Sequence, residues 1–159
     1  MNIFILDRDP TLAAKQQCDK HVVKMILESA QMLSTVHHFT NSSIKDRLYK
    51  PTHKNHPCTK WVGESTSNYQ WLYRHFIALC QEYTRRYGKT HLTEQKMGNL
   101  LSTIPDLPTG ELTDFKLAMP DEYKSDCPVE SYRQYYISKQ HNFNMTWKNL
   151  KVPEWFYYE

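Results

Sequence analysis

Apolar residues between residues 20 and 39 recur at the spacing of an α-helix and cover a wide arc of its surface. They are Val22, Val23, Met25, Ile26, Leu27, Ala30, Leu33 and Val36. The remaining narrow stripe consists of His21, Lys24, Glu28, Gln31 and Thr35. So wide an apolar arc predicts a largely buried helix, in which the polar stripe is the only face left to meet a cleft or water. Asp19 is the expected N-cap of this helix.

The rest of the chain has the pattern of further helices. The predicted helices are residues 11–17 after Asp9-Pro10, a short helix from Pro57 to Gly63, a long helix at 66–87 that ends before Gly88, a weaker one at 92–103, and one from Pro128 to about 143. Residues 2–7 are short, apolar and extended, and residues 104–128 have several prolines and little periodicity. The sequence therefore predicts an all-α protein that forms one compact domain over residues 1–159.

His21 and Glu28 are seven residues apart, which places them within about 20° of each other on one face of a helix. A carboxylate on a mostly buried helix needs a charged or hydrogen-bonding neighbour, because burying it alone is costly. One interpretation is that Glu28 does catalytic work beside His21. The other is an ordinary surface pair between Glu28 and Lys24, four residues earlier. The spacing alone leaves both interpretations open.

The net charge of +3 is unevenly distributed. Between residues 45 and 60 there is one acidic residue, Asp46, against five basic ones: Lys45, Arg47, Lys50, Lys54 and Lys60. Such a basic segment favours a phosphate backbone as partner, although a solvated lysine-rich loop has the same composition. We expect DNA contacts from Lys24, Lys50, Lys54, Asn55, His56 and Lys60.

A metal site is a weaker interpretation of the same segment. His53, His56 and Cys58 lie within six positions, but H-x-x-H-x-C is not a structural zinc pattern. We therefore expect no metal in this segment. The four cysteines lack any CxxC pair and are expected to be free thiols. No P-loop, GxGxxG, HExxH or GxSxG motif is present.

The chain ends in an aromatic tail, residues 147–159. Trp155, Phe156 and Tyr158 are either core residues or a platform on which bases stack, and the sequence favours the two equally. We include all three among the expected DNA contacts. The N-terminus lacks the apolar region of a signal peptide, and no segment is long and apolar enough to span a bilayer. We therefore expect a soluble intracellular protein, located in the cytoplasm, or in the host cytoplasm if a phage encodes it.

Four short patterns together resemble the pyrimidine-dimer DNA glycosylases, the endonuclease V-like enzymes, in a phage-type branch. They are Asp19-x-His21 with Glu28, the sequence Asn55-His56-Pro57, the helix that ends in EYTRRYG, and Pro153-x-Trp155-Phe156-x-Tyr158. The resemblance implies a small helical DNA-binding domain whose N-terminal α-amine attacks the sugar of a damaged or modified pyrimidine nucleotide. It further implies AP-lyase activity, duplex DNA as substrate, and a monomer with no obligate protein partner.

Carried onto this sequence, the resemblance makes the α-amine of Met1 the nucleophile and Glu28 the general acid and base. His21 would orient the Glu28 carboxylate or contact a phosphate. The sequence differs from the family at two points: Asn2 is too large for easy removal of Met1, and Leu27 and Gln31 stand where basic residues are expected. Two alternatives follow, namely other chemistry on a modified base, as in phage DNA hypermodification, and a nucleic-acid-binding module without catalysis.

Overall fold

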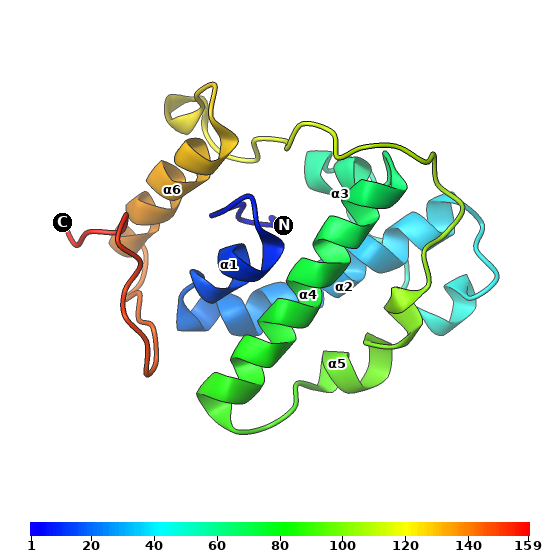
Figure 1. The fold of residues 1–159 in the computed structure, drawn as a ribbon, viewed down its shortest axis with the longest axis horizontal. Helices are drawn as coiled ribbons and strands as arrows, with labels where there is room; N and C mark the ends of the chain where they lie inside the picture. The colour runs from blue at the N-terminus through cyan, green and yellow to red at the C-terminus, as the bar shows by residue number, and fades with distance from the viewer.

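Helices and connecting segments make up the whole of the computed structural model, which describes residues 1–159 (Figure 1). The α-helices are α1 (Pro10–Lys15), α2 (Asp19–Phe39), α3 (Pro57–Val62), α4 (Thr66–Tyr87), α5 (Leu92–Met97) and α6 (Pro128–Ser138). Single 3-10 turns are η1 (Lys45–Arg47), η2 (Leu100–Ser102), η3 (Asp121–Tyr123) and η4 (Lys139–His141). The predicted all-α class is confirmed, and the extended segment at residues 2–7 pairs with no strand.

Local sequence signals set most of the helix ends. The Asp9 side chain accepts hydrogen bonds from the backbone N–H groups of Thr11 and Leu12, and Pro10 occupies the first turn of α1. Ser65 caps α4 in the same way. Gly88 ends α4 with φ of 71°, a left-handed conformation that glycine adopts without strain.

Three details of the predicted helices are wrong. Helix α2 begins at Asp19 with Cys18 as its N-cap, so Asp19 does not cap it. The helices predicted at 92–103 and 128–143 end earlier, at Met97 and Ser138, each followed by a 3-10 turn. On α2 itself, Val23 and Leu27 are 37% and 41% exposed, so the apolar arc is narrower than the sequence indicated.

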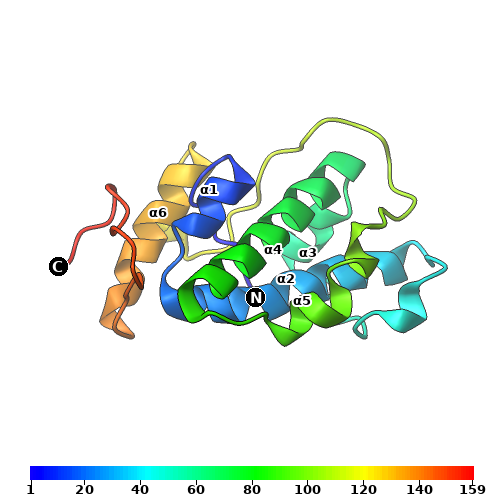
Figure 2. The same ribbon diagram turned by 60° about the horizontal axis from the view of Figure 1, so that its bottom comes forward.

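The core lies where α2 and α4 pack against each other, with α1 on α4 and α3 beside both. Figure 2 shows residues 104–128 arching over α3 and α4 to reach α6, which lies at the side of α1 together with the C-terminal segment. That long connection is tied to the core, since Asn68 accepts a hydrogen bond from Thr113 and Trp61 donates one to the Thr113 carbonyl. No helix has the length and apolar character required to cross a membrane.

Candidate active site

The N-terminal amine and Glu28 form an ion pair in a partly closed pocket. The Met1 nitrogen lies 3.5 Å from Glu28 Oε1, and the Glu28 side chain is only 13% exposed. Glu28 Oε2 is buried without a hydrogen-bond partner, and the Lys24 ammonium lies 3.8 Å away. Glu28 is therefore not one half of an exposed surface pair. A buried carboxylate oxygen without a partner is costly and is typical of a site that receives a ligand or a proton.

Contacts of residues 1–4 hold the amine in this position. Asn2 Oδ1 accepts the backbone N–H groups of Ile3 and Phe4, and its amide donates to the Ala118 carbonyl at 2.8 Å. The Met1 side chain is buried, and its sulfur accepts a hydrogen bond from Thr59. Phe4 has φ of 60°, which is strained for a bulky residue. The tight turn at Phe4 therefore depends on these surrounding contacts.

The pocket has a volume of about 140 Å³. Its lining consists of Met1, Asn2, Phe4, His21, Lys24, Met25, Glu28, Tyr135 and Lys139. These residues come from the N-terminal segment, from one face of α2, and from α6 with η4. Figure 1 shows the N-terminus in the middle of the fold, beside α1 and α4. The pocket therefore lies where the N-terminal segment meets α2 and the end of α6.

His21 shares the pocket with Glu28, as the seven-residue spacing predicts, but no hydrogen bond joins the two side chains. Its ring stacks on Phe4 with centroids 4.7 Å apart, and its Nδ1 lies 2.8 Å from the Tyr136 hydroxyl. Burial, together with the nearby ammonium groups of Lys139, Lys24 and Lys20, lowers the pKa of His21 to about 3. His21 is therefore an uncharged ring at neutral pH, and it can attract a phosphate only by hydrogen bonding.

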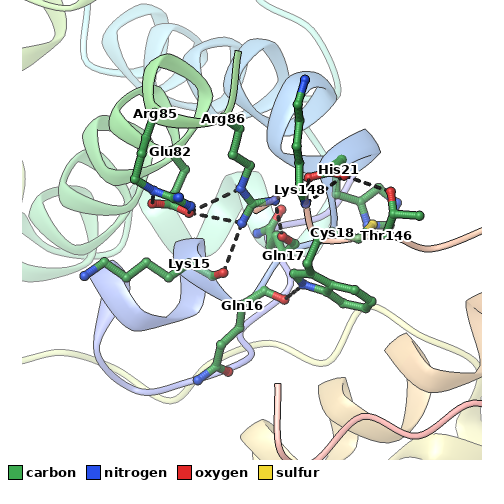
Figure 3. A network of polar contacts seen from close by, with 12 residues as sticks. Lys15, Gln16, Gln17, Cys18, His21, Glu82, Arg85, Arg86, Thr146 and Lys148 are labelled. Atoms are coloured by element: carbon green, nitrogen blue, oxygen red, sulfur yellow. Dashed lines mark hydrogen bonds and ion pairs between the residues drawn. The ribbon is translucent and has the colours of Figure 1, made fainter. Parts of the chain in front are cut away.

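A buried arginine fixes the start of α2, which carries His21. Figure 3 shows the Arg86 guanidinium between Glu82 and the turn that joins α1 to α2. It donates to the carbonyls of Lys15 and Gln17 and pairs with Glu82 and Asp19 at 3.1 Å. This network explains why Asp19 does not cap α2: its carboxylate serves Arg86 and also accepts the backbone N–H of Lys148.

Positive charge lines the mouth of the pocket. The Lys24 side chain is 65% exposed beside Glu28. Lys139 lies on the opposite side, with its ammonium group 4.5 Å from the centre of the Tyr135 ring. An anionic group entering the pocket would meet both ammonium groups. Sequence reasoning identified Lys24 but missed Lys139, Tyr135 and Phe4, because nothing in the local pattern links them to residues so far away in the chain.

The basic segment 45–60 runs along the same side of α2. Thr35 is seven residues after Glu28 on the polar stripe, and its hydroxyl accepts the backbone N–H of Thr52. Within the segment, Lys50, Lys54, Asn55 and Lys60 are exposed. Through Thr52, the segment that carries them is held against α2.

His56 differs from its neighbours because it lies close to the N-terminal amine. Its Nδ1 accepts the backbone N–H of Cys58 and so caps α3. Burial lowers the pKa of His56, and the positive charge of the N-terminal amine acts in the same direction. His56 therefore lies beside Met1.

No group of three or more His, Cys, Asp or Glu side chains could hold a metal ion.

Comparison with known proteins agrees with this geometry. Residues 1–95 match the family model described as pyrimidine dimer DNA glycosylase. The chain belongs to the pyrimidine dimer DNA glycosylase family. A search of curated proteins and a search of solved structures gave no match.

Membership of this family makes the chain a DNA glycosylase by class of activity. The matched range contains Met1, His21, Glu28 and the basic segment, whereas Tyr135 and Lys139 lie beyond it. The pocket of this glycosylase is therefore built partly from a region outside the match.

The aromatic tail corrects one expectation. Phe156 is 6% exposed and packs against Trp147 in the core, so its ring is not a free stacking surface. Trp155 is half-buried beneath the Arg133 guanidinium. Arg133 and Tyr135 point in nearly opposite directions, about 200° apart on α6, so Trp155 is on the side of α6 away from the pocket. Tyr158 is 60% exposed: its hydroxyl donates to the Met145 carbonyl and its ring meets Phe156 edge to face, but much of the ring surface remains open to a partner.

Proposed function

We propose that the protein cleaves the glycosidic bond of a damaged or modified pyrimidine nucleotide in duplex DNA and then cuts the strand as an AP lyase. The observation that carries this proposal is the 3.5 Å approach of the Met1 amine to Glu28 inside a pocket rimmed by lysines. A primary amine and a carboxylate in contact are the two groups that imine chemistry requires. The protein would act as a monomer, without a cofactor.

In the first step the neutral Met1 amine attacks C1′ of the sugar. The glycosidic bond breaks and its electron pair leaves with the base, which takes up a proton. The attached nitrogen then loses protons, the C1′–O4′ bond breaks so that the sugar ring opens and O4′ takes up a proton, and the imine between the Met1 nitrogen and C1′ forms. Glu28 can accept a proton from the nitrogen and pass it to O4′, which leaves it as a carboxylate. Glu28 supports this step because its Oε2 has no hydrogen-bond partner and can accept a proton.

In the second step the imine acidifies the proton on C2′. Glu28 removes this proton, the electron pair forms a double bond between C2′ and C3′, and the C3′–O bond breaks with the phosphate as leaving group. Water then hydrolyses the imine and releases the amine. One carboxylate can serve both steps because each step returns it to the protonation state that the next one needs.

Binding would come from two surfaces. Lys24 and Lys139 at the pocket mouth would hold the phosphates that flank the target nucleotide, and Lys50, Lys54, Asn55 and Lys60 would extend the contact along the backbone. Access to C1′ requires the target nucleotide to leave the base stack. His56 lies beside the N-terminal amine and could help to position Met1 as well as contact the DNA backbone.

Borohydride trapping tests this function, because reduction converts the imine to a stable covalent bond. Duplexes with an abasic site, a cyclobutane dimer or a hydroxymethylated pyrimidine should include at least one that cross-links to the protein at Met1. Acetylation of the N-terminal amine should abolish the cross-link. Strand cleavage by the acetylated protein at the unmodified rate would reject the mechanism.

Other chemistry on a modified base is the second candidate, and the surroundings of Glu28 favour it. Leu27 is 41% exposed and Gln31 is uncharged, so neither supplies the positive charge expected beside a damaged-nucleotide site. This candidate predicts base conversion that depends on Glu28 and survives acetylation of Met1. The trapping experiment therefore separates the two functions.

A further inference from the structure

A buried hydroxyl group lies behind the pocket and determines which hydrogen His21 presents to it. Tyr136, on α6, is fully buried. Its oxygen is 2.9 Å from the backbone nitrogen of Cys18, 2.8 Å from His21 Nδ1 and 3.2 Å from Cys18 Sγ. Three groups therefore compete for one hydroxyl.

Counting donors and acceptors assigns the hydrogen atoms. The hydroxyl has one hydrogen and two lone pairs, and one lone pair accepts the Cys18 backbone N–H. The hydrogen goes either to His21 Nδ1 or to Cys18 Sγ. A neutral imidazole nitrogen is a strong acceptor and a thiol sulfur is a weak one, so the stable arrangement has Tyr136 donating to His21 Nδ1. The His21 proton must then be on Nε2.

The other ring nitrogen faces open space. His21 Nε2 has no hydrogen-bond partner in the protein, and it is not one of the fully buried polar atoms, so it is accessible. The accessible space beside His21 is the pocket that holds the Met1 amine and Glu28. Because Phe4 stacks on the ring and Phe143 meets it edge to face, the ring cannot easily turn over.

We propose that Tyr136 is a positioning residue that fixes His21 as the Nε2–H tautomer, so that His21 offers the pocket an uncharged hydrogen-bond donor for an oxygen of the bound sugar-phosphate. The part that concerns substrate rests on the proposed function, whereas the tautomer does not. A neutral donor is useful here because Lys24 and Lys139 already supply charge, and a further cation would repel the Met1 ammonium group.

Nitrogen NMR of the unmodified protein tests the tautomer directly. With ¹⁵N-labelled histidine, His21 should show an unprotonated Nδ1 and a protonated Nε2 at neutral pH. The opposite assignment would overturn the proposal and leave the imine mechanism intact. Failure of borohydride trapping with the expected tautomer would reject the proposed function instead.

Two matched variants test the positioning role. Tyr136→Phe removes the hydroxyl that holds His21, so it should give a mixture of tautomers. It should also slow single-turnover cleavage by about tenfold, the change in rate expected from the loss of one neutral hydrogen bond. Tyr73→Phe is the control, because the hydroxyl of this half-buried α4 tyrosine donates to the Gly98 carbonyl and neither residue lines the pocket. It should leave both the tautomer and the cleavage rate unchanged.

The proposed contact fails if Tyr136→Phe folds, shows mixed tautomers and cleaves at the unmodified rate. If Tyr136→Phe does not fold, the NMR assignment still decides the tautomer. His21→Phe, which keeps the stacking on Phe4, then decides the contact: its cleavage should slow by at least tenfold, and an unchanged rate would overturn the proposal.

Discussion

The α-amine of Met1 lies 3.5 Å from the carboxylate of Glu28, so the proposed nucleophile and the proposed general acid and base form one ion pair. The pairing depends on the turn at residues 2–4 and on α2, which bring the chain terminus onto the polar stripe. One oxygen of Glu28 faces the amine, and the other is buried without a hydrogen-bond partner. This asymmetry lets Glu28 hold the nucleophile with one oxygen and exchange a proton with the other.

Replacement of Glu28 by glutamine should abolish turnover and leave the fold intact. Glutamine keeps the volume and can still hydrogen-bond, but it cannot exchange a proton, and general acid–base groups contribute about 10²- to 10⁴-fold to the rate. Single-turnover cleavage and thermal unfolding of Glu28→Gln measure the two effects. Glu130→Gln, on the exposed face of α6, is the matched control. An active and stable Glu28→Gln protein would leave Glu28 with no catalytic role.

Affinity for DNA should depend steeply on salt because exposed lysines of the basic segment would replace counterions on the phosphates. Charge reversal at Lys50 and Lys54 should reduce the slope of log K against log salt by about 0.9 for each phosphate that the protein no longer neutralises. Lys15→Glu, on α1 outside the segment, should leave the slope unchanged. A slope near zero in the unmodified protein would remove the basic segment as a DNA surface.

The sequence predicted the helices and half of the site, because both depend on local spacing. The positions of His21 and Glu28 on one face follow from seven residues of helix, and the caps at Asp9 and Gly88 from residue type. Lys139 could not be found in this way, since its place at the pocket results from the packing of α6 against the N-terminus. Asp19 failed as a cap because Arg86 and the backbone of residue 148, both distant in sequence, bind its carboxylate.

Loss of the Lys139 charge should weaken substrate binding more than it slows the chemical step. The ammonium group lines the pocket over Tyr135, where it can meet a phosphate. Lys139→Gln should therefore raise Kd for DNA by about 10- to 150-fold, in line with the removal of one charged hydrogen bond of about 1.5–3 kcal/mol. The single-turnover rate at saturating DNA should change little. Lys151→Gln, in the exposed tail, is the control, and equal effects of both variants would argue against a specific contact.

The free energy of unfolding should fall as the pH drops below about 6.5, because buried histidines are held neutral. Burial lowers the pKa of His21 to about 3 and those of His37 and His75 to about 4, from 6.5. Below pH 6.5 the unfolded chain binds protons that the native protein excludes, so stability decreases towards pH 4. Three such groups give a slope of about 4 kcal/mol per pH unit near pH 5.

Urea unfolding at a series of pH values measures this slope. His75→Gln keeps a hydrogen-bonding side chain beside Gln17. It should reduce the dependence of the free energy of unfolding on pH by the contribution of about one proton. Below about pH 4.5, Glu82 adds to the loss: although burial opposes it, the Arg85 and Arg86 guanidinium groups lower the pKa of this carboxyl. A constant free energy of unfolding between pH 6.5 and pH 5 would contradict the buried, neutral state of the histidines.

The aromatic tail should divide into a structural residue and a binding residue. Phe156 is buried against Trp147, so Phe156→Ala should lower the free energy of unfolding by about 3–5 kcal/mol, the usual cost of removing a core phenylalanine. Tyr158 is exposed and donates one hydrogen bond to the Met145 carbonyl, so Tyr158→Ala should lower the free energy of unfolding by only about 0.5–1.5 kcal/mol. It should weaken DNA binding by about 1–3 kcal/mol if a base stacks on its ring. Tyr157→Ala, at the neighbouring and similarly exposed tyrosine, is the matched control and should change neither quantity.

Urea unfolding and fluorescence anisotropy with duplex DNA, at a temperature where all variants are folded, separate the two roles. Equal DNA affinity for the Tyr157 and Tyr158 variants would show that the tail serves the fold alone.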